Sequence, residues 1–303
     1  MKKEELFLKS FIDEVPISVL VITPEVEPKG IVQIVHGMVD HKERYLNFME
    51  FLASQGFIAI ASDVRGHGKS IKEKNDLGYF YNDGANSAVE DVHQVSLYIK
   101  DKYPNLNLSL FGHSMGSLIV RNYIKKYDNE IRELIVCGSP SYNNSVEFAL
   151  SIIKILKKIK GDRYRSKTLK NICFNGFNKD LPGNNKYKWI CSNEEVVKLY
   201  ENDPLCNYIF TLNGFESLFN LMKEAYSKEG WNVKNPELPI MFISGEDDRT
   251  MVTYDKWIDA QNLLKEIGYK NVTNKLYEKY RHEILNEVDN DKIYLDIIEF
   301  ISK

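Results

Sequence analysis

A serine flanked by glycines is the residue of this chain with the clearest chemical implication. The sequence G-H-S-M-G at 112–116 fits the pattern G-x-S-x-G, and it follows an apolar run and precedes an amphipathic segment. In a sharp strand-to-helix turn, glycines such as Gly112 and Gly116 avoid clashes while the turn exposes the serine hydroxyl. We therefore expect Ser114 to be a nucleophile and the backbone N–H of Met115 to donate to an oxyanion.

A serine hydroxyl is a weak nucleophile and needs a base and an acid that orients the base. After a turn of this type the acid comes next in the chain and the histidine last. Of the six histidines, only His282 follows the apolar run at 239–244, and the acidic sequence 246–248 directly follows that run. We expect His282 to be the base and Asp248 the acid, with Asp247 as the alternative acid.

The loop after the apolar run at 31–35 is expected to supply the second oxyanion donor, the backbone N–H of Met38. Gly37 would permit close approach, and His36 would brace the loop. The same stretch nearly matches the H-x-H-x-D-H ligand set of two-metal hydrolases, but Met38 replaces the second histidine, so no metal site is predicted. No phosphate loop or dinucleotide fingerprint is complete, and no cofactor is expected.

The elements that must position these residues follow from hydrophobic periodicity. Short β-branched runs alternate with amphipathic segments, which is typical of a parallel sheet with crossover helices. No strand is evident between about residues 139 and 236. We expect 1–139 and 237–303 to form one α/β domain, interrupted by a helical insertion at 140–236. Strands are predicted at 17–22, 30–35, 57–62, 106–111, 133–137, 239–244 and 272–277, and later helices at 254–267 and 289–301.

Composition excludes several classes of protein. The chain has 303 residues, 43% of them hydrophobic and 12% aromatic, with a formal net charge of -3, so neither disorder nor nucleic-acid binding is expected. No run approaches the roughly 18 to 20 apolar residues that span a bilayer. The start lacks a signal-length apolar run, and four widely spaced cysteines are typical of free thiols. A cytoplasmic location is therefore expected; the oligomeric state is not indicated.

One stretch departs from this near-neutral balance. Residues 141–170 carry eight basic and two acidic side chains, and apolar residues recur there at helical spacing from Ala149 to Ile159. Two interpretations remain open. The helix could pack on the core with a solvated polar face, or the region near 149–170 could contact an anionic lipid surface or attract substrates with anionic head groups.

Several motifs in register resemble those of one branch of the α/β-hydrolases, which contains monoacylglycerol lipases and lysophospholipases and is often labelled serine aminopeptidase S33-like. They are H-G-M-V-D-H-K-E-R-Y at 36–45, D-V-R-G-H-G-K-S at 63–70, G-H-S-M-G at 112–116, S-G-E-D-D at 244–248 and R-H-E-I-L-N at 281–286, together with W-I-C-S-N-E-E-V-V at 189–197 and N-D-P-L-C at 202–206. The resemblance implies a mostly parallel sheet flanked by helices with a helical cap. It also implies the triad Ser114, Asp248 and His282, with Met38 and Met115 as oxyanion donors.

The expected function is hydrolysis of single-chain acyl esters, monoacylglycerols or lysophospholipids, by a serine hydrolase that forms an acyl-enzyme. The only expected partner besides a lipid surface is this small-molecule ester. An aminopeptidase of the S33 type would use the same triad but would need an acidic group for the substrate's amino terminus, Glu194 or Glu195 in the insertion. A noncatalytic binding module of the same fold would normally have lost a triad member.

Overall fold

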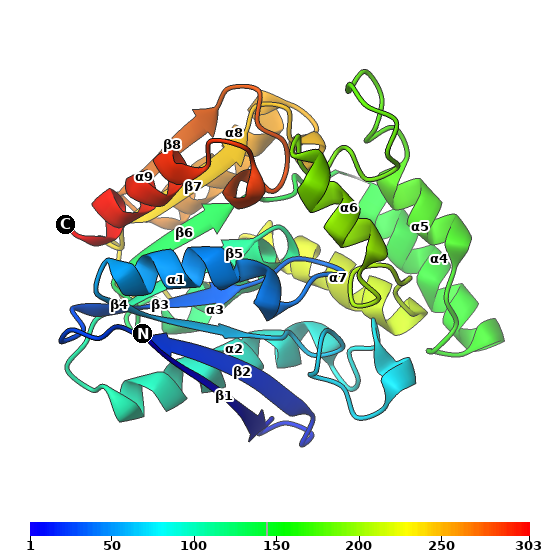
Figure 1. The fold of residues 1–303 in the computed structure, drawn as a ribbon. Helices are drawn as coiled ribbons and strands as arrows, with labels where there is room; N and C mark the ends of the chain where they lie inside the picture. The colour runs from blue at the N-terminus through cyan, green and yellow to red at the C-terminus, as the bar shows by residue number, and fades with distance from the viewer. Residues whose placement is uncertain (144) are drawn as a thin grey trace.

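An eight-stranded sheet forms the centre of the protein in the computed structural model, which describes residues 1–143 and 145–303 (Figure 1). The strand order is β1-β2-β4-β3-β5-β6-β7-β8. β1 pairs with β2 and β2 with β4 in antiparallel orientation, and every later pair is parallel. The strands are β1 (Lys2–Lys9), β2 (Pro16–Thr23), β3 (Gly30–Val35), β4 (Phe57–Ser62), β5 (Leu108–His113), β6 (Glu133–Cys137), β7 (Ile240–Gly245) and β8 (Val272–Tyr277).

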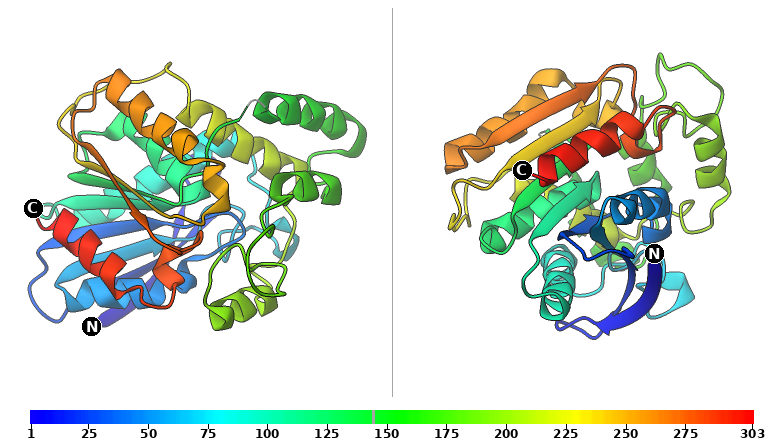
Figure 2. Two further views of the ribbon diagram at one scale, coloured as in Figure 1. Left: turned by 90° about the horizontal axis from the view of Figure 1, so that it is seen from above. Right: turned by 60° about the vertical axis from the view of Figure 1, so that its left-hand side comes forward.

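Helices cover both faces of this sheet, which explains why its central strands β3 and β4 are buried along their whole length and largely apolar (Figures 1 and 2). Successive side chains of a strand point to opposite faces. In β3, Val32 and Ile34 join the core beneath α1 (Leu46–Ser54) and α9 (Asp291–Ile301). Ile31 and Val35 join the opposite core, beneath α2 (Gly84–Lys102), α3 (Met115–Tyr127) and α8 (Tyr254–Ile267).

The first strand, β1, was not among the predicted elements. It lies at the sheet edge, and its residues alternate between half-buried and exposed. Its lysines and glutamates hide the strand pattern, and such charges also discourage pairing with another chain. The other strands agree with the prediction, apart from shifts of one or two residues at the ends of β2, β5 and β7.

Between β6 and β7 the chain leaves the sheet and forms four helices; we call this part the inserted segment. In Figure 1 its first three helices lie to the right of the sheet, and α7 packs against α2, α3 and α4. No helix among the described residues is long and apolar enough to cross a membrane. The helices are α4 (Ser145–Lys160), α5 (Lys167–Phe174), α6 (Glu194–Asn202) and α7 (Leu212–Ala225), and short 3-10 helices elsewhere are η1 (Lys42–Tyr45), η2 (Lys74–Asp76), η3 (Arg249–Met251) and η4 (Ile284–Asn286).

Candidate active site

Ser114 occupies the sharp turn between β5 and α3 that its flanking glycines predict. Its backbone has φ 54° and ψ -118°, a conformation that L-residues rarely adopt. A Cβ atom at Gly112 would lie 2.5 Å from the carbonyl oxygen of Gly116, and one at Gly116 would lie 2.1 Å from that of Val35. Only glycine fits at either position, and the turn presents Ser114 beyond the end of β5.

Asp248 and His282 are hydrogen-bonded to each other. Asp248 follows β7, and each of its carboxylate oxygens lies 3.0 Å from Nδ1 of His282. The carboxylate is buried and also accepts hydrogen bonds from Ser244 Oγ at 3.0 Å and from the N–H and hydroxyl of Thr250, both at 2.8 Å. Asp247 makes no side-chain hydrogen bond to any described residue, so of the two candidate acids the structure places Asp248 against the imidazole.

Gly245 allows the acid and base loops to meet. A Cβ atom there would lie 2.1 Å from the carbonyl oxygen of Tyr280 and 2.3 Å from that of Arg281. The backbone N–H of Asp247 donates to Tyr280 at 2.9 Å, which fixes the two loops to each other. The glycine that follows the buried part of β7 is therefore what permits the carboxylate of Asp248 to reach His282.

The Asp248–His282 pair shifts both pKa values. Burial by itself lowers the pKa of His282, but the charge and hydrogen bond of Asp248 outweigh it, so the pKa is raised. Burial by itself raises the pKa of Asp248, and the His282 interaction and the Thr250 hydrogen bonds bring the net pKa below its usual value. Because Nδ1–H is held by the carboxylate, Nε2 keeps the lone pair that a base needs.

Ser114 and His282 line the same cavity. The ring of His113, the neighbour of Ser114, lies 4.7 Å from the ring of His282 between centroids. Among the described residues no hydrogen bond joins the Ser114 hydroxyl to His282. Catalytic hydrogen bonds of this kind often tighten only when substrate is bound.

The loop after β3 lies against Ser114. A Cβ atom at Gly37 would lie 3.1 Å from Cβ of Ser114. His36 braces the loop, as predicted: its Nε2 accepts from the N–H of Val64 at 2.9 Å, and Nδ1 lies 2.8 Å from the carbonyl oxygen of Gly37. Burial lowers the pKa of His36 to about 4, so the ring is neutral. The N–H of Met38 donates to no acceptor among the described residues, which leaves it available to a substrate oxygen.

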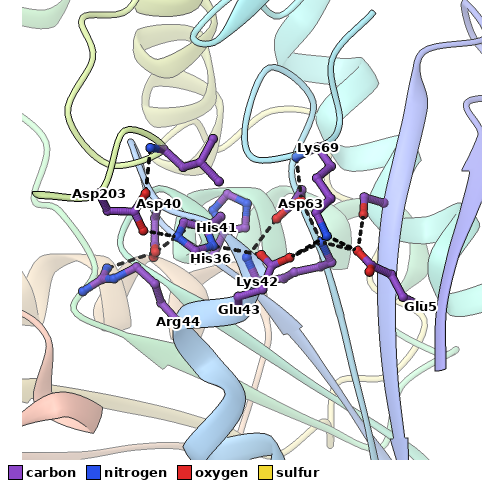
Figure 3. A network of polar contacts seen from close by, with 12 residues as sticks. Glu5, His36, Asp40, His41, Lys42, Glu43, Arg44, Asp63, Lys69 and Asp203 are labelled. Atoms are coloured by element: carbon purple, nitrogen blue, oxygen red, sulfur yellow. Dashed lines mark hydrogen bonds and ion pairs between the residues drawn. The ribbon is translucent and has the colours of Figure 1, made fainter. Parts of the chain in front are cut away.

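Asp40 organises the residues behind this loop (Figure 3). It accepts hydrogen bonds from the N–H of Gly37 at 3.3 Å, from Arg44 at 3.0 Å and from the Tyr45 hydroxyl at 3.0 Å. The Tyr45 oxygen lies 3.1 Å from Nδ1 of His113, whose other ring nitrogen lies 3.2 Å from the carbonyl oxygen of His282. The network thus connects the loop after β3, which carries the predicted oxyanion donor, with the serine turn and His282, and the sequence analysis did not identify it.

A buried ion pair anchors the same loop from the other side. Lys42 Nζ lies 2.9 Å from Asp63 Oδ2, and neither side chain is exposed (Figure 3). The Asp63 carboxylate also accepts from the backbone N–H groups of Lys42 at 2.9 Å and Lys69 at 2.8 Å. The stretch at 63–70 therefore holds the loop after β3, and its glycine turn packs closely on Asp63, because a Cβ atom at Gly68 would lie 2.3 Å from the Asp63 carboxylate.

His41 joins the oxyanion loop to the inserted segment (Figure 3). Its Nδ1 lies 2.8 Å from Glu43 and its Nε2 lies 2.9 Å from Asp203, which belongs to the N-D-P-L-C motif. His41, Asp203 and Cys206 form a group of ligand type with their donor atoms within 4.8 Å of one another. Because both ring nitrogens already bind carboxylates, we describe the three residues His41, Glu43 and Asp203 as an ion-paired clasp.

The loop that carries His282 is also fixed to the inserted segment. Glu283 forms a two-pronged ion pair with Arg44 at 2.6 and 2.7 Å, and its backbone N–H donates to Ile190 at 2.7 Å. Arg281 donates to the carbonyl oxygen of Cys191 at 3.0 Å. The ring of Trp189 lies 5.2 Å from that of His282. The motif at 189–197 was noted in the sequence, but its contact with the base was not foreseen.

A cavity of about 510 Å³ opens on these groups, within the size range of small-molecule sites. The cavity is lined by Ser114, His282, Met38 and Met115, and the inserted segment supplies most of the remaining wall. This wall is largely apolar and includes Val146, Ile152, Phe174, Phe215, Leu218 and Phe219. Such a chamber suits a hydrocarbon chain better than a polar metabolite.

Known proteins share both the sequence pattern and the fold. A family model described as "Serine aminopeptidase, S33" matches residues 26–289. The chain is 23% identical over 282 residues to the monoacylglycerol lipase of Mycolicibacterium smegmatis, covering 92% of this chain and 90% of the relative. It is 24% identical over 274 residues to phospholipase YtpA of Bacillus subtilis, covering 88% and 93%.

A solved structure of a thermostable carboxyl esterase from Bacillus coagulans, in complex with glycerol, has a TM-score of 0.89 and 27% identity, and the match covers 100% of this chain and 98% of that one. A monoglyceride lipase from Saccharomyces cerevisiae has a TM-score of 0.74 at 18% identity, covering 99% and 95%, and shows the same fold. With the family model matching most of the chain, this protein belongs to the serine aminopeptidase S33 family and is a hydrolase with the α/β-hydrolase fold of the monoacylglycerol lipase type.

Proposed function

We propose that this hydrolase cleaves single-chain acyl esters, monoacylglycerols or lysophospholipids, through an acyl-enzyme on Ser114. The observation that carries the proposal is the apolar cavity. It is lined by Ser114 and by His282, whose imidazole is oriented by Asp248. Relatives named monoacylglycerol lipase and phospholipase, and a similar structure named carboxyl esterase, support the ester class. An acyl ester whose chain lies in the cavity would place its carbonyl beside Ser114.

The proposed reaction has two half-reactions. Ser114 Oγ attacks the acyl carbonyl while Nε2 of His282 takes the hydroxyl proton, and the backbone N–H groups of Met38 and Met115 donate to the oxyanion. His282 then gives its proton to the alcohol oxygen as the C–O bond breaks. In the second half, His282 takes a proton from water, which attacks the acyl-enzyme, and the fatty acid leaves with the serine hydroxyl restored. Asp248 holds the tautomer of His282 and stabilises the imidazolium.

We further propose that residues 140–236 form a cap over a core made of 1–139 and 237–303. The apolar walls that this segment contributes to the cavity support the division. So do the clasp and the Arg44–Glu283 pair, which fix the core beside it.

All four cysteines are free thiols, which supports the predicted cytoplasmic location.

The aminopeptidase alternative lacks its expected acidic group in the cavity. Glu194 and Glu195 are both exposed, and neither lines the cavity. Glu195 pairs instead with Lys198 at 2.9 Å on the surface of α6. A free amino terminus would therefore find no carboxylate from these two residues, and the ester reaction is favoured.

A hydrolysis panel tests the proposal. It contains p-nitrophenyl esters of increasing chain length, monoacylglycerols, lysophospholipids and aminoacyl anilides, each with wild type and Ser114→Ala. We expect turnover of the acyl esters that rises with chain length and disappears in the variant, because the cavity walls are apolar. Turnover confined to the anilides, or esterase activity that survives the substitution, would refute the proposal.

A further inference from the structure

One cation of the inserted segment faces the cavity without an anionic partner. The acidic groups of the lining, Asp40 and Glu283, are both ion-paired to Arg44. Two lysines also line the cavity. Lys186 lies 3.3 Å from Glu201, whereas Lys170 is half-buried and forms no side-chain hydrogen bond or ion pair with any residue in 1–143 or 145–303. A half-buried ammonium group normally has a partner, so this one is suited to receive a partner from a ligand.

The surroundings of Lys170 favour an anion there. Partial burial removes water from the ammonium group, and the neighbouring positive charge of Lys186 repels it, so the pKa of Lys170 is lowered. A negatively charged ligand group beside the two lysines would offset both the loss of water and the repulsion between them. Apart from Asp40, Glu283 and the two lysines, the residues that line the cavity offer apolar and aromatic side chains, histidines and neutral polar groups such as Asn178. The described lining therefore provides two positive charges, of which only that of Lys186 has a carboxylate partner.

A chain of aromatic contacts connects the helix that carries Lys170 to His282. In acyl transfer the imidazole gives its proton to the leaving oxygen, so the head group lies on the His282 side of the carbonyl. The His282 ring packs 5.2 Å from Trp189, and the Trp189 ring lies 5.7 Å from Phe174. Lys170 precedes Phe174 by four residues on α5, so both share one helix face, about 6 Å apart along the axis.

We propose that Lys170, with Lys186 beside it, forms a subsite for the phosphate of an acyl ester substrate, so that the enzyme prefers a lysophospholipid with an anionic head group to a neutral monoacylglycerol. The inference rests on the proposed ester hydrolysis at Ser114 and adds the identity of the head group. Ammonium groups bind phosphate oxygens by charge-assisted hydrogen bonds, which are the stronger kind.

The test uses two substrates with the same short acyl chain, both kept below micelle-forming concentrations: a monoacylglycerol and the corresponding acylglycerol phosphate. Lys170→Met keeps the length of the side chain and removes its charge. We expect this variant to lose at least about tenfold in kcat/KM for the phosphate ester, mainly through KM, with little change for the neutral ester. Lys170→Arg should retain the preference for the phosphate ester.

Lys167→Met is the matched control, because Lys167 is on the same helix, exposed, and not part of the cavity lining. It should leave both substrates unaffected. An equal loss for both esters in Lys170→Met, or no loss for the phosphate ester, would overturn the subsite. Turnover of the neutral ester with no preference for the phosphate refutes the subsite alone, whereas a wild type that cleaves neither ester refutes the proposed function as well.

Discussion

His282 shows how two opposing physical effects set the reactivity of one side chain. Burial disfavours its charged form, and the hydrogen-bonded carboxylate of Asp248 favours it more strongly, so the pKa is raised. The proposed base must be neutral to accept the proton of Ser114. A raised pKa leaves more of the His282 ring protonated at a given pH. As the pH is lowered, activity should therefore begin to fall at a higher pH than it would with a free imidazole.

The pH dependence of kcat/KM should show this acid limb with a midpoint above pH 6.5, the usual imidazole value. In Asp248→Asn the carboxylate charge is lost and burial remains, so the limb should move to lower pH. The rate should fall by roughly 10³ to 10⁴ because the tautomer is no longer held. A limb that stays in place in this variant would show that another group titrates. Asp247→Asn is the matched control and should change neither the limb nor the rate by much.

The contacts that fix the loops belong to the scale of elements. Arg44, in η1, joins Asp40 in the oxyanion loop to Glu283 beside the base, and its ring neighbour in α6 is Tyr200 at 4.9 Å. The clasp at His41 makes a second connection from the same loop to Asp203. Three segments that are distant in sequence are therefore held together by ion pairs, of which the Arg44 pairs are nearly shielded from water and the clasp is partly exposed.

Glu283→Gln should destabilise the fold, because it leaves one side of the Arg44 guanidinium, whose side chain is only 12% exposed, without its carboxylate. We expect a loss of about 3 kcal/mol in the free energy of unfolding, measured by urea denaturation. Glu195→Gln removes the exposed partner of Lys198 and should cost less than about 1 kcal/mol. Equal, small losses in both variants would mean that the Arg44 pair contributes no more than a surface pair.

The clasp should make stability depend on pH. The carboxylates of Glu43 and Asp203 outweigh the effect of burial and raise the pKa of His41 in the folded protein. The contribution of the clasp to the free energy of unfolding is complete below about pH 6.5, the pKa of His41 in the unfolded chain. It is lost as the pH rises through the raised pKa of His41 in the folded protein. The difference in unfolding free energy between wild type and Asp203→Asn should therefore shrink from pH 6 to pH 9. A constant difference would contradict the protonated clasp.

Local sequence patterns were sufficient to locate every strand of the described sheet except β1. The bounds of β3, β4, β6 and β8 were predicted to the residue. β3, β4 and β6 are buried along their whole length and largely apolar, because both faces of the sheet are covered there, whereas the middle residues of β8 are exposed. The contacts of Tyr45 with His113 and of Trp189 with His282 join residues far apart in the chain. No periodicity encodes such contacts, so only the structure could reveal them.

At the scale of the whole molecule, apolar side chains line the cavity and are also exposed to solvent. Phe148 on α4, Ile172 on α5 and Val252 after η3 are 70%, 63% and 60% exposed. Lys154 and Lys158 are exposed on α4 as well. We propose that these five exposed residues contact an anionic lipid surface. The three apolar side chains would enter the interface, and the two lysines would bind lipid phosphates. Val146 and Ile153 of the same helix are buried, so α4 also packs on the protein.

Co-sedimentation with vesicles that contain anionic lipid should show binding at low salt that weakens as salt is added. Lys154→Gln combined with Lys158→Gln should reduce binding severalfold. Lys157 is unsuitable for this test because it pairs with Glu216 at 2.6 Å. Lys198→Gln, on α6, is the control and should bind like wild type. Absence of binding at low salt, or binding that the double variant leaves unchanged, would refute the lipid contact.

The central claim is that Ser114 is the nucleophile, and labelling by an active-site phosphonate with identification of the modified peptide tests it most directly. The strained turn, the oriented imidazole and the available N–H of Met38 predict one phosphonate per chain, attached to Ser114. Labelling should follow the acid limb of His282 and be absent in Ser114→Ala. A phosphonate found on another residue, or labelling that persists in folded Ser114→Ala, would contradict the account.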